Sequence, residues 1–560
     1  MNTKYAPADR SSHECLLISN LSLDKITYLN DIFCSLSFIF CLLFIPTLAQ
    51  AQEIVPLPNS YKQSGGLFKV PQTMTISNSD LLFSGLISTF SESVKKYTSV
   101  KVIETRKNAI ILLVRNPQIS GKEAYRIKIG QQKITIEAGF PGGCFYGLQS
   151  LLQLLHSANQ SGQIACAEIT DQPRYEWRGL MLDESRHFFG QVEVKKILDL
   201  MALHKLNKFH WHLTDSQGWR IEIRQYPLLT SVGAKGNNTD PDAPAEFYTQ
   251  EQISQIIHYA AERFIEVIPE IDMPGHATAA AKAYPEFSGG GSKRMPDFTF
   301  NPGKEGTYQF LTNILQEVAD LFPSKYIHIG GDEVSYGNQQ WLDIPEIRQL
   351  MLRENLKNLL DVEHYFLKRM ANSIQKMGKT MIGWDEVVSA GLTSNTCVMW
   401  WRHDRPQMLD LAIKKGFEVI LCPRIPLYFD FVQNNTHKDG RKWSGKFAPI
   451  ESVYKFPLEE FTGGVSISSP LIKGIQANLW TETMHTNDRL EFMTFPRLSA
   501  LAESAWTNQE FKNFSDFLIR MKNMEDIYKK SNVLYYDFRN PDAGKEIGGP
   551  VKPKNATELE

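Results

Sequence analysis

The chain has 560 residues, of which 42% are hydrophobic and 22% charged, and its formal net charge is −2. This balance is typical of a globular protein that is long enough for two or three domains. The near-neutral charge, with Lys and Arg scattered along the chain, argues against a surface for nucleic acid or another polyanion.

An apolar run near the N-terminus is typical of an export signal. Residues 32–48 are almost entirely apolar, and Ala49-Gln50-Ala51 follows them as a small-x-small cleavage sequence. The run is interrupted by Pro46 and is marginal in length for a membrane span, although retention as an anchor stays open. We therefore expect residues 1–51 to be a leader and the protein to be exported to the periplasm, the cell surface or the medium.

The cysteines give no sign of a metal centre. Three of the seven, Cys15, Cys34 and Cys41, lie in the predicted leader. The remaining four lack the CxxC or His/Cys spacing of a zinc site, so neither a metal nor a cofactor is expected. Whether any of these four pair as disulfides stays open: Cys144, Cys166, Cys397 and Cys422.

Residues 52–172 are predicted to form a small α+β domain. Short β-rich stretches cover residues 73–76, 109–114, 125–129 and 133–137. Residues 147–155 have helical periodicity after a Gly-rich turn, and they are the one helix expected in this region.

Residues 173–507 contain a regular alternation that predicts a (β/α)8 barrel. Eight apolar, strand-like runs occupy residues 178–183, 208–215, 264–272, 325–333, 379–386, 397–402, 417–423 and 474–482. Most are separated by segments of helical period, such as residues 248–263, which open with the capping-box pair Thr249 and Gln252. Residues 391–395 join two runs without an evident helix. The fold class is therefore α/β, a (β/α)8 barrel preceded by a small α+β domain.

Residues 508–560 are predicted to close the chain. Residues 510–530 have the pattern of an amphipathic helix, and the sequence from Asn540 onward is polar and rich in Gly, Pro and Lys. We expect this tail to be mobile.

Carboxylates and aromatic side chains recur where the predicted barrel strands end. The active site of such a barrel is built at the carboxyl ends of its strands, so these side chains are expected to converge there. The fourth run ends in Gly330-Gly331-Asp332-Glu333, a tight turn that presents two adjacent acids. Neighbouring side chains of an extended backbone point to opposite sides, which makes this pair unsuitable as the opposed acid and nucleophile of an ordinary glycosidase. On its own the pair could equally be two solvated acids after a core strand.

Seven segments, in chain order, resemble glycoside hydrolase family 20, the β-N-acetylhexosaminidases. The most specific of them is His328-Ile-Gly-Gly-Asp-Glu333 in a strand-to-loop setting. The seven segments are residues 177–187, 205–220, 266–276, 328–334, 382–386, 428–430 and 478–482. Residues 123–127 and 145–149 are similar to the small domain of the same family.

The resemblance implies a retaining, substrate-assisted reaction. The acetamido oxygen of the substrate would attack the anomeric carbon and give an oxazolinium intermediate. Glu333 would act as general acid and then as base, and Asp332 would stay ionised and orient the acetamido N–H. Tyr428 would donate its hydroxyl to the acetamido oxygen, and Arg178 would hold ring hydroxyls, although it begins its predicted strand rather than ending it.

The family pattern also assigns the walls of the pocket. Trp384, Trp401 and Trp480 would enclose the N-acetyl group, with Trp401 favoured over Trp400 because it directly precedes Arg402. Asp430 and Glu482 are expected to bind distal hydroxyls and to restrict the enzyme to exo action.

Two further residues are expected near the acids. His276 would contact the catalytic acid or its immediate surroundings, with a buried structural histidine as the alternative, and Asp215 is a weaker candidate. The expected substrate is a glycan with a terminal β-linked GlcNAc or GalNAc, with no nucleic-acid partner and no stable membrane span. The sequence does not distinguish a monomer from a homodimer.

Two other functions remain open at this stage. A hydrolase of the same family that releases a disaccharide would need the same catalytic set in a more open pocket. A glycan-binding barrel without activity would be expected to have lost Glu333 or Tyr428, and both are present. No GxGxxG or P-loop spacing supports a nucleotide site.

Overall fold

The computed structural model describes residues 53–442, 445–541 and 546–548. The predicted leader, residues 1–51, lies outside these residues, as do its three cysteines. Within the described part, no helix combines the length and the apolar character that crossing a membrane requires. Cys144, Cys166, Cys397 and Cys422 are buried free thiols.

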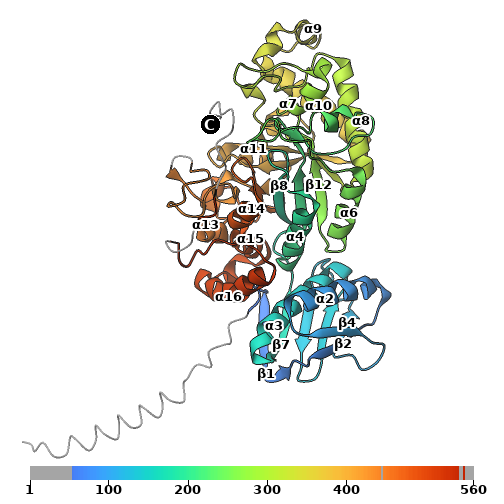
Figure 1. Cartoon of the computed structure of the whole chain (residues 1–560), viewed down its shortest axis with the longest axis vertical. Helices are drawn as coiled ribbons and strands as arrows, with labels where there is room; N and C mark the ends of the chain where they lie inside the picture. Colours follow the sequence, from blue (N-terminus) through green and yellow to red (C-terminus); the bar gives the residue numbers. More distant parts are fainter. Residues whose placement is uncertain (1–52, 443–444, 542–545, 549–560) are drawn as a thin grey trace, which may run out of the picture. The chain divides into compact units, whose positions relative to one another are not determined.

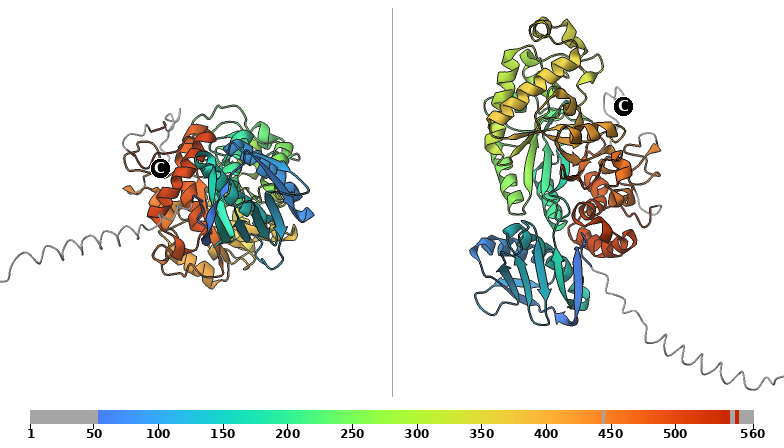
Figure 2. Two further views of the ribbon diagram at one scale, coloured as in Figure 1. Left: turned by 90° about the horizontal axis from the view of Figure 1, so that it is seen from below. Right: turned by 180° about the vertical axis from the view of Figure 1, so that it is seen from behind.

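The small domain is a seven-stranded sheet of order β1-β7-β5-β6-β4-β2-β3. Its strands are β1 Ser60–Lys69, β2 Thr73–Asn78, β3 Lys101–Glu104, β4 Ile111–Arg115, β5 Tyr125–Ile129, β6 Ile134–Ala138 and β7 Gln163–Asp171. Two helices, α2 (Ser84–Tyr97) and α3 (Pro141–Ser161), pack against each other and cover one face of the sheet (Figure 1), whose opposite face is turned to the viewer in the right-hand view of Figure 2. The α+β class is as predicted.

The expectation of a single helix in this domain is wrong. The missed helix α2 has Leu86, Ile87, Phe90 and Val94 on its buried side, at the spacing of a helical stripe. Its sequence also contains four serines and three β-branched residues, Ile87, Thr89 and Val94, which lower helix propensity. Packing against α3 therefore decides its conformation more than local preference does.

The second domain is the predicted closed barrel of eight parallel strands. The strands are β8 Trp177–Asp183, β9 Lys208–His212, β12 Glu266–Glu270, β13 Tyr326–His328, β14 Thr380–Trp384, β15 Cys397–Trp400, β16 Glu418–Leu421 and β17 Ile472–Leu479. Almost every strand residue is buried, as expected for parallel strands covered on both faces. Several strands end before the predicted apolar run does, so the residues that follow them belong to loops at the carboxyl end.

Helices cover the outside of the barrel, as Figure 1 shows for α6 and α8 beside β12. The main ones are α4 Gly190–Leu203, α6 Gln250–Ala261, α8 Glu305–Leu321, α10 Leu359–Lys376, α11 Pro406–Lys414 and α15 Arg497–Trp506. The capping box of α6 is present: Thr249 accepts from the backbone of Gln252, whose side chain accepts from the backbone of Thr249. The described residues between β14 and β15 include no α-helix, as predicted, and form a 3₁₀ segment at Asp385–Ala390.

The last helix, α16 (Phe514–Lys530), packs on α2 and α3 of the small domain. It starts four residues later than predicted, because Asn513 caps it by accepting from the backbone of Asp516. Most of the predicted mobile tail lies outside the described residues. Glu546 within it accepts hydrogen bonds from the backbone N–H groups of Lys438 and Asp439.

Candidate active site

The two adjacent acids lie in a loop and not on a strand. β13 ends at His328, and Gly330 and Gly331 both have positive φ, +67° and +86°. Glu333 also has positive φ, 54°, so the local backbone is not extended and the expected alternation of neighbouring side chains does not apply. The tight turn, and not strand pleating, separates the two carboxylates.

His276 lies between the acids and Asp215. Its Nδ1 is 3.0 Å from Asp215 Oδ1, and its Nε2 is 3.6 Å from Asp332 Oδ2 and 3.7 Å from Glu333 Oε2. His276 comes from the loop after β12, and Asp215 from the short strand β10 (Thr214–Asp215) after β9. Three neighbouring barrel strands therefore contribute to one charged cluster.

The pKa values in this cluster are shifted by burial and by one cation. Burial raises the pKa of Glu333 and of Asp332, and the neighbouring His276 partly offsets this for both. Burial alone would lower the pKa of His276, but Asp215 and Asp332 raise it to about 9. A raised pKa is what a general acid needs in Glu333. Asp332 was expected to stay ionised. Its raised pKa means that it loses its proton at a higher pH than an ordinary aspartate does.

An aromatic wall flanks the acids. Trp384, Trp401, Tyr428 and Trp480 belong to one buried cluster, whereas Trp400 belongs to the main core of the barrel. The rings of Trp401 and Tyr428 are parallel, with centroids 6.1 Å apart. The indole N–H groups of Trp384 and Trp401 donate to Glu270 (3.1 Å) and Glu386 (3.0 Å). These bonds hold both indole rings in place and leave their faces for apolar contact.

Asp430 and Glu482 lie on either side of one arginine. Arg441 Nε is 2.9 Å from Asp430 Oδ2, and Arg441 Nη2 is 2.6 Å from Glu482 Oε1. The second oxygens, Asp430 Oδ1 and Glu482 Oε2, are buried and have no hydrogen-bond partner among the described residues. Buried acceptors without donors are costly, so both are candidates to receive ligand hydroxyls.

The structure corrects the role of Arg178. This residue lies at the start of β8, where its guanidinium donates to Glu123 twice (2.8 and 2.9 Å) and to the carbonyl oxygens of Lys205 and Tyr175. Its side chain has no exposed surface, so it has no donor available to a sugar. It joins the barrel to the small domain.

Arg186, which the sequence reasoning missed, is the arginine at the carboxyl end of β8. Its Nη1 is 2.8 Å from Asp215 Oδ2, its guanidinium lies 4.8 Å from the Trp480 ring centroid, and its Nε has no hydrogen-bond partner in the described chain. Its position three residues after Asp183, the last residue of β8, was the signal that strand-end logic could have used.

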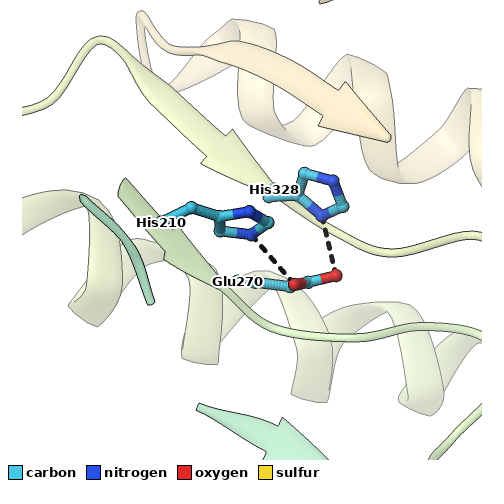
Figure 3. A group of neighbouring side chains, drawn as sticks. All are labelled: His210, Glu270 and His328. Atoms are coloured by element: carbon cyan, nitrogen blue, oxygen red, sulfur yellow. Dashed lines mark ion pairs between the residues drawn. The ribbon is translucent and has the colours of Figure 1, made fainter. Parts of the chain in front are cut away.

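Glu270, at the end of β12, organises the residues beneath the acids. Figure 3 shows its carboxylate between His210 and His328, at 2.9 Å and 2.8 Å. It also lies 2.6 Å from Nδ1 of His212, whose Nε2 is 3.1 Å from Asp215. Burial alone would lower the pKa of His212, but Glu270 and Asp215 raise it to about 10, so His212 is a cation held between two carboxylates.

His210, Glu270 and His328 have the ligand atoms of a metal site within 4.8 Å of one another. Glu270 also accepts from Trp384, His210 Nδ1 accepts from the amide of Gln476, and His328 Nδ1 accepts from the backbone N–H of Gly330. This arrangement suits a network of protein hydrogen bonds better than a metal centre.

The barrel places two acids and an aromatic wall at the carboxyl ends of its strands. This is the architecture of a glycoside hydrolase. The chain belongs to glycosyl hydrolase family 20: the model of its catalytic domain matches residues 175–509, and the model of its domain 2 matches residues 51–172.

Known proteins agree with this assignment. A beta-hexosaminidase of Porphyromonas gingivalis is 34% identical over 525 residues, which are 89% of this chain and 67% of that protein. The exo beta-N-acetylglucosaminidase of Vibrio harveyi, solved with N-acetylglucosamine, superposes with a TM-score of 0.80 at 32% identity, covering 88% of this chain and 79% of that one. The beta-N-acetylhexosaminidase of Bacteroides fragilis has a TM-score of 0.77 at 32% identity, covering 86% and 96%.

Proposed function

We propose that this glycoside hydrolase is an exo-acting β-N-acetylhexosaminidase that removes terminal GlcNAc or GalNAc by substrate-assisted, retaining catalysis. The observation that carries the proposal is the position of the two acids. They are neighbours in one loop and share His276, at 3.6 and 3.7 Å, instead of facing each other across a sugar as acid and nucleophile. The names of the relatives point to the same activity.

In the first step the acetamido oxygen attacks the anomeric carbon. The bond from this carbon to the leaving oxygen breaks, and the proton of Glu333 passes to that oxygen. Asp332 accepts a hydrogen bond from the acetamido N–H group and stabilises the positive charge that develops on the oxazolinium ring. In the second step water attacks the anomeric carbon, returns its proton to Glu333 and reopens the ring, so the anomeric configuration is retained.

The pocket walls fit a terminal sugar. Trp384, Trp401 and Trp480 supply apolar surface for the N-acetyl methyl group, and Tyr428 lies beside them in the same cluster. The open acceptors of Asp430 and Glu482 and the open Nε donor of Arg186 suit the hydroxyls of an unsubstituted sugar end.

The direct test is hydrolysis of an aryl β-N-acetylglucosaminide and of the matching β-glucoside by purified residues 52–560. We expect turnover of the N-acetyl substrate alone, because a glucoside lacks the internal nucleophile. Equal turnover of both would contradict acetamido participation. Release of a disaccharide from a glycan, with the aryl monosaccharide untouched, would favour the alternative hydrolase.

The two acids should respond differently to the leaving group. Glu333→Gln should lose about 100-fold or more in kcat/KM on substrates with poor leaving groups, yet little on activated aryl glycosides, which need no protonation. Asp332→Asn should be severely impaired on both, since the oxazolinium charge develops in either case. A series of aryl leaving groups of graded pKa measures this, and equal slopes for the two variants would contradict the assigned roles.

A further inference from the structure

Arg441 is a basic residue that the catalytic scheme does not use. It lies in the loop between β16 and β17, 13 positions after Tyr428 and far in sequence from Glu482. Its guanidinium nevertheless spans two of the pocket carboxylates, with Nε 2.9 Å from Asp430 and Nη2 2.6 Å from Glu482. A planar fork of donors is suited to holding two acceptors at a set separation.

The loop is built to bring Arg441 back to Asp430. The backbone N–H of Arg441 donates to the carbonyl oxygen of Asp430, and the N–H of Val432 donates to the carbonyl oxygen of Arg441. Gly440 has a φ of +112°, and a Cβ there would lie 2.6 Å from Val432. The buried Arg489 donates to the carbonyl oxygen of Asp439 at 2.6 Å. These contacts secure the turn on which Arg441 stands.

The two carboxylates need a cation between them. Burial raises the pKa of Asp430 to about 7, although Arg441 lowers it, with Glu482 and Arg497 as the other charged groups nearby. Burial also opposes ionisation of Glu482, but Arg441 and then Arg186 bring its pKa below the usual value. Without Arg441, the buried Asp430 and the partly buried Glu482 would repel each other, and at least one of them would take up a proton.

Each carboxylate keeps one oxygen for a ligand. Arg441 binds Asp430 Oδ2 and Glu482 Oε1, and the other oxygen of each has no partner among the described residues. The guanidinium of Arg441 therefore favours the ionised form of both carboxylates and fixes their orientation. It leaves one oxygen of each carboxylate available to accept from a sugar hydroxyl.

We propose that Arg441 is a positioning residue that determines specificity for the hydroxyls of the terminal sugar remote from the anomeric carbon, by holding Asp430 and Glu482 as a pair of oriented acceptors. The inference rests on the proposed function, because Arg441 would position the two carboxylates that bind the sugar hydroxyls in that site. It also names the ligand chemistry: neutral sugar hydroxyls that donate to carboxylates, on an unsubstituted terminal residue.

The test combines variants of Arg441 with deoxy substrates. Arg441→Met should lower kcat/KM for the aryl N-acetylglucosaminide about 10- to 100-fold, mainly through a higher KM, because charge-assisted hydrogen bonds to the sugar are lost. The wild type should already have a lower kcat/KM on the 4-deoxy and 6-deoxy analogues. On at least one of them, Arg441→Met should cause little further loss of kcat/KM. Arg441→Lys should recover part of the loss, since one ammonium cannot span both acids.

The pH dependence of KM gives a second readout. With Arg441 in place, KM should rise as the pH falls through about 7, where Asp430 takes up a proton. In Arg441→Met the rise should begin at higher pH, because the cation that lowers this pKa is gone. Lys442→Met is the matched control: it removes a neighbouring charge whose ammonium group donates to the carbonyl oxygen of Asn435, and it should change neither KM nor its pH dependence.

An equal penalty on the parent and on both deoxy substrates, with kcat falling and KM constant, would overturn the proposal in favour of a purely structural role. Calorimetric binding of free GlcNAc and its deoxy analogues separates the proposal from the proposed function, since binding needs no turnover. A wild type that binds without hydrolysing would refute the activity, and the deoxy comparison would still decide the role of Arg441. If GlcNAc is neither bound nor hydrolysed, both are wrong.

Discussion

His276 shows how a single side chain sets the protonation of two others. It is surrounded by Asp215, Asp332 and Glu333, and its pKa of about 9 makes it a cation at neutral pH. Asp332 must be ionised and Glu333 protonated for the proposed reaction, yet both lie in a site where burial favours the neutral acid. The histidine cation favours the ionised form of each, and so sets the pH window in which one has lost its proton and the other has not.

Replacing His276 by Gln should therefore move the whole pH profile of kcat/KM to higher pH. The acid limb follows ionisation of Asp332 and the basic limb follows loss of the Glu333 proton, and both pKa values rise when the cation is removed. Activity at the optimum should also fall. His258→Gln, which alters a histidine whose side chain is 79% exposed, serves as the control and should leave both limbs in place. Limbs that stay or move to lower pH would show that His276 is not the controlling charge.

At the scale of elements, the catalytic loop depends on how closely the ends of β12 and β13 approach. A Cβ on Gly330 would lie 1.8 Å from Asp272 Oδ1, a contact that no real side chain makes. Gly330 also has a φ of +67°, which disfavours any L-residue. The turn that presents Asp332 and Glu333 therefore requires glycine for two separate reasons.

Gly330→Ala should lower kcat/KM by more than about 100-fold, since a displacement of about 1 Å at the acids is enough for such a loss. Gly378→Ala is the matched control: its φ is +76°, but a Cβ there has nothing within 4 Å. It should lose only about 1–2 kcal/mol in the free energy of unfolding, from the left-handed backbone, and keep its activity. Steady-state kinetics and urea unfolding of both variants measure this. Similar activity in the two would mean that the close approach to Asp272 relaxes without effect.

At the scale of the whole molecule, the small domain and the barrel share a buried charge network. Arg178 of β8 donates to Glu123 of the small domain, and Lys205 lies 3.2 Å from Asp171 at the end of β7. Trp506 donates to the same Asp171 and stacks near both cations, 4.9 Å from Arg178 and 4.5 Å from Lys205. These contacts make the two domains dependent on each other for stability.

Glu123→Gln should destabilise the protein by about 3 kcal/mol, because it leaves the fully buried Arg178 without its carboxylate. KM should be unchanged, since neither residue is in the sugar site. Glu305→Gln offers the matched comparison: Glu305 also binds an arginine with both oxygens, but its side chain is 77% exposed, so its loss should be below about 1 kcal/mol. A raised KM in Glu123→Gln, with stability intact, would restore the sugar-binding role first expected of Arg178.

The barrel, the small domain and the segment that carries the acids could all be predicted from the sequence. Apolar runs of strand length alternating with helical periods are local patterns, and so is a Gly-Gly turn before two carboxylates. The same local reasoning failed for α2, where packing outweighs helix propensity. It also failed for Asp332 and Glu333, because the separation of their carboxylates depends on a left-handed backbone conformation at Glu333 that the sequence pattern does not predict.

Which arginines belong to the site depends on how the folded chain packs, and could not be predicted from local patterns. Arg178 and Arg186 stand in one motif, yet β8 extends about 16 Å from Arg178 to Asp183, so they lie towards opposite ends of the barrel. Arg441 could not be found from the strand ends, because its position depends on a loop that folds back onto Asp430 and on Glu482 in the turn after β17. Charged side chains from distant segments are brought together by packing, and the periodicity of a single segment does not predict how it packs.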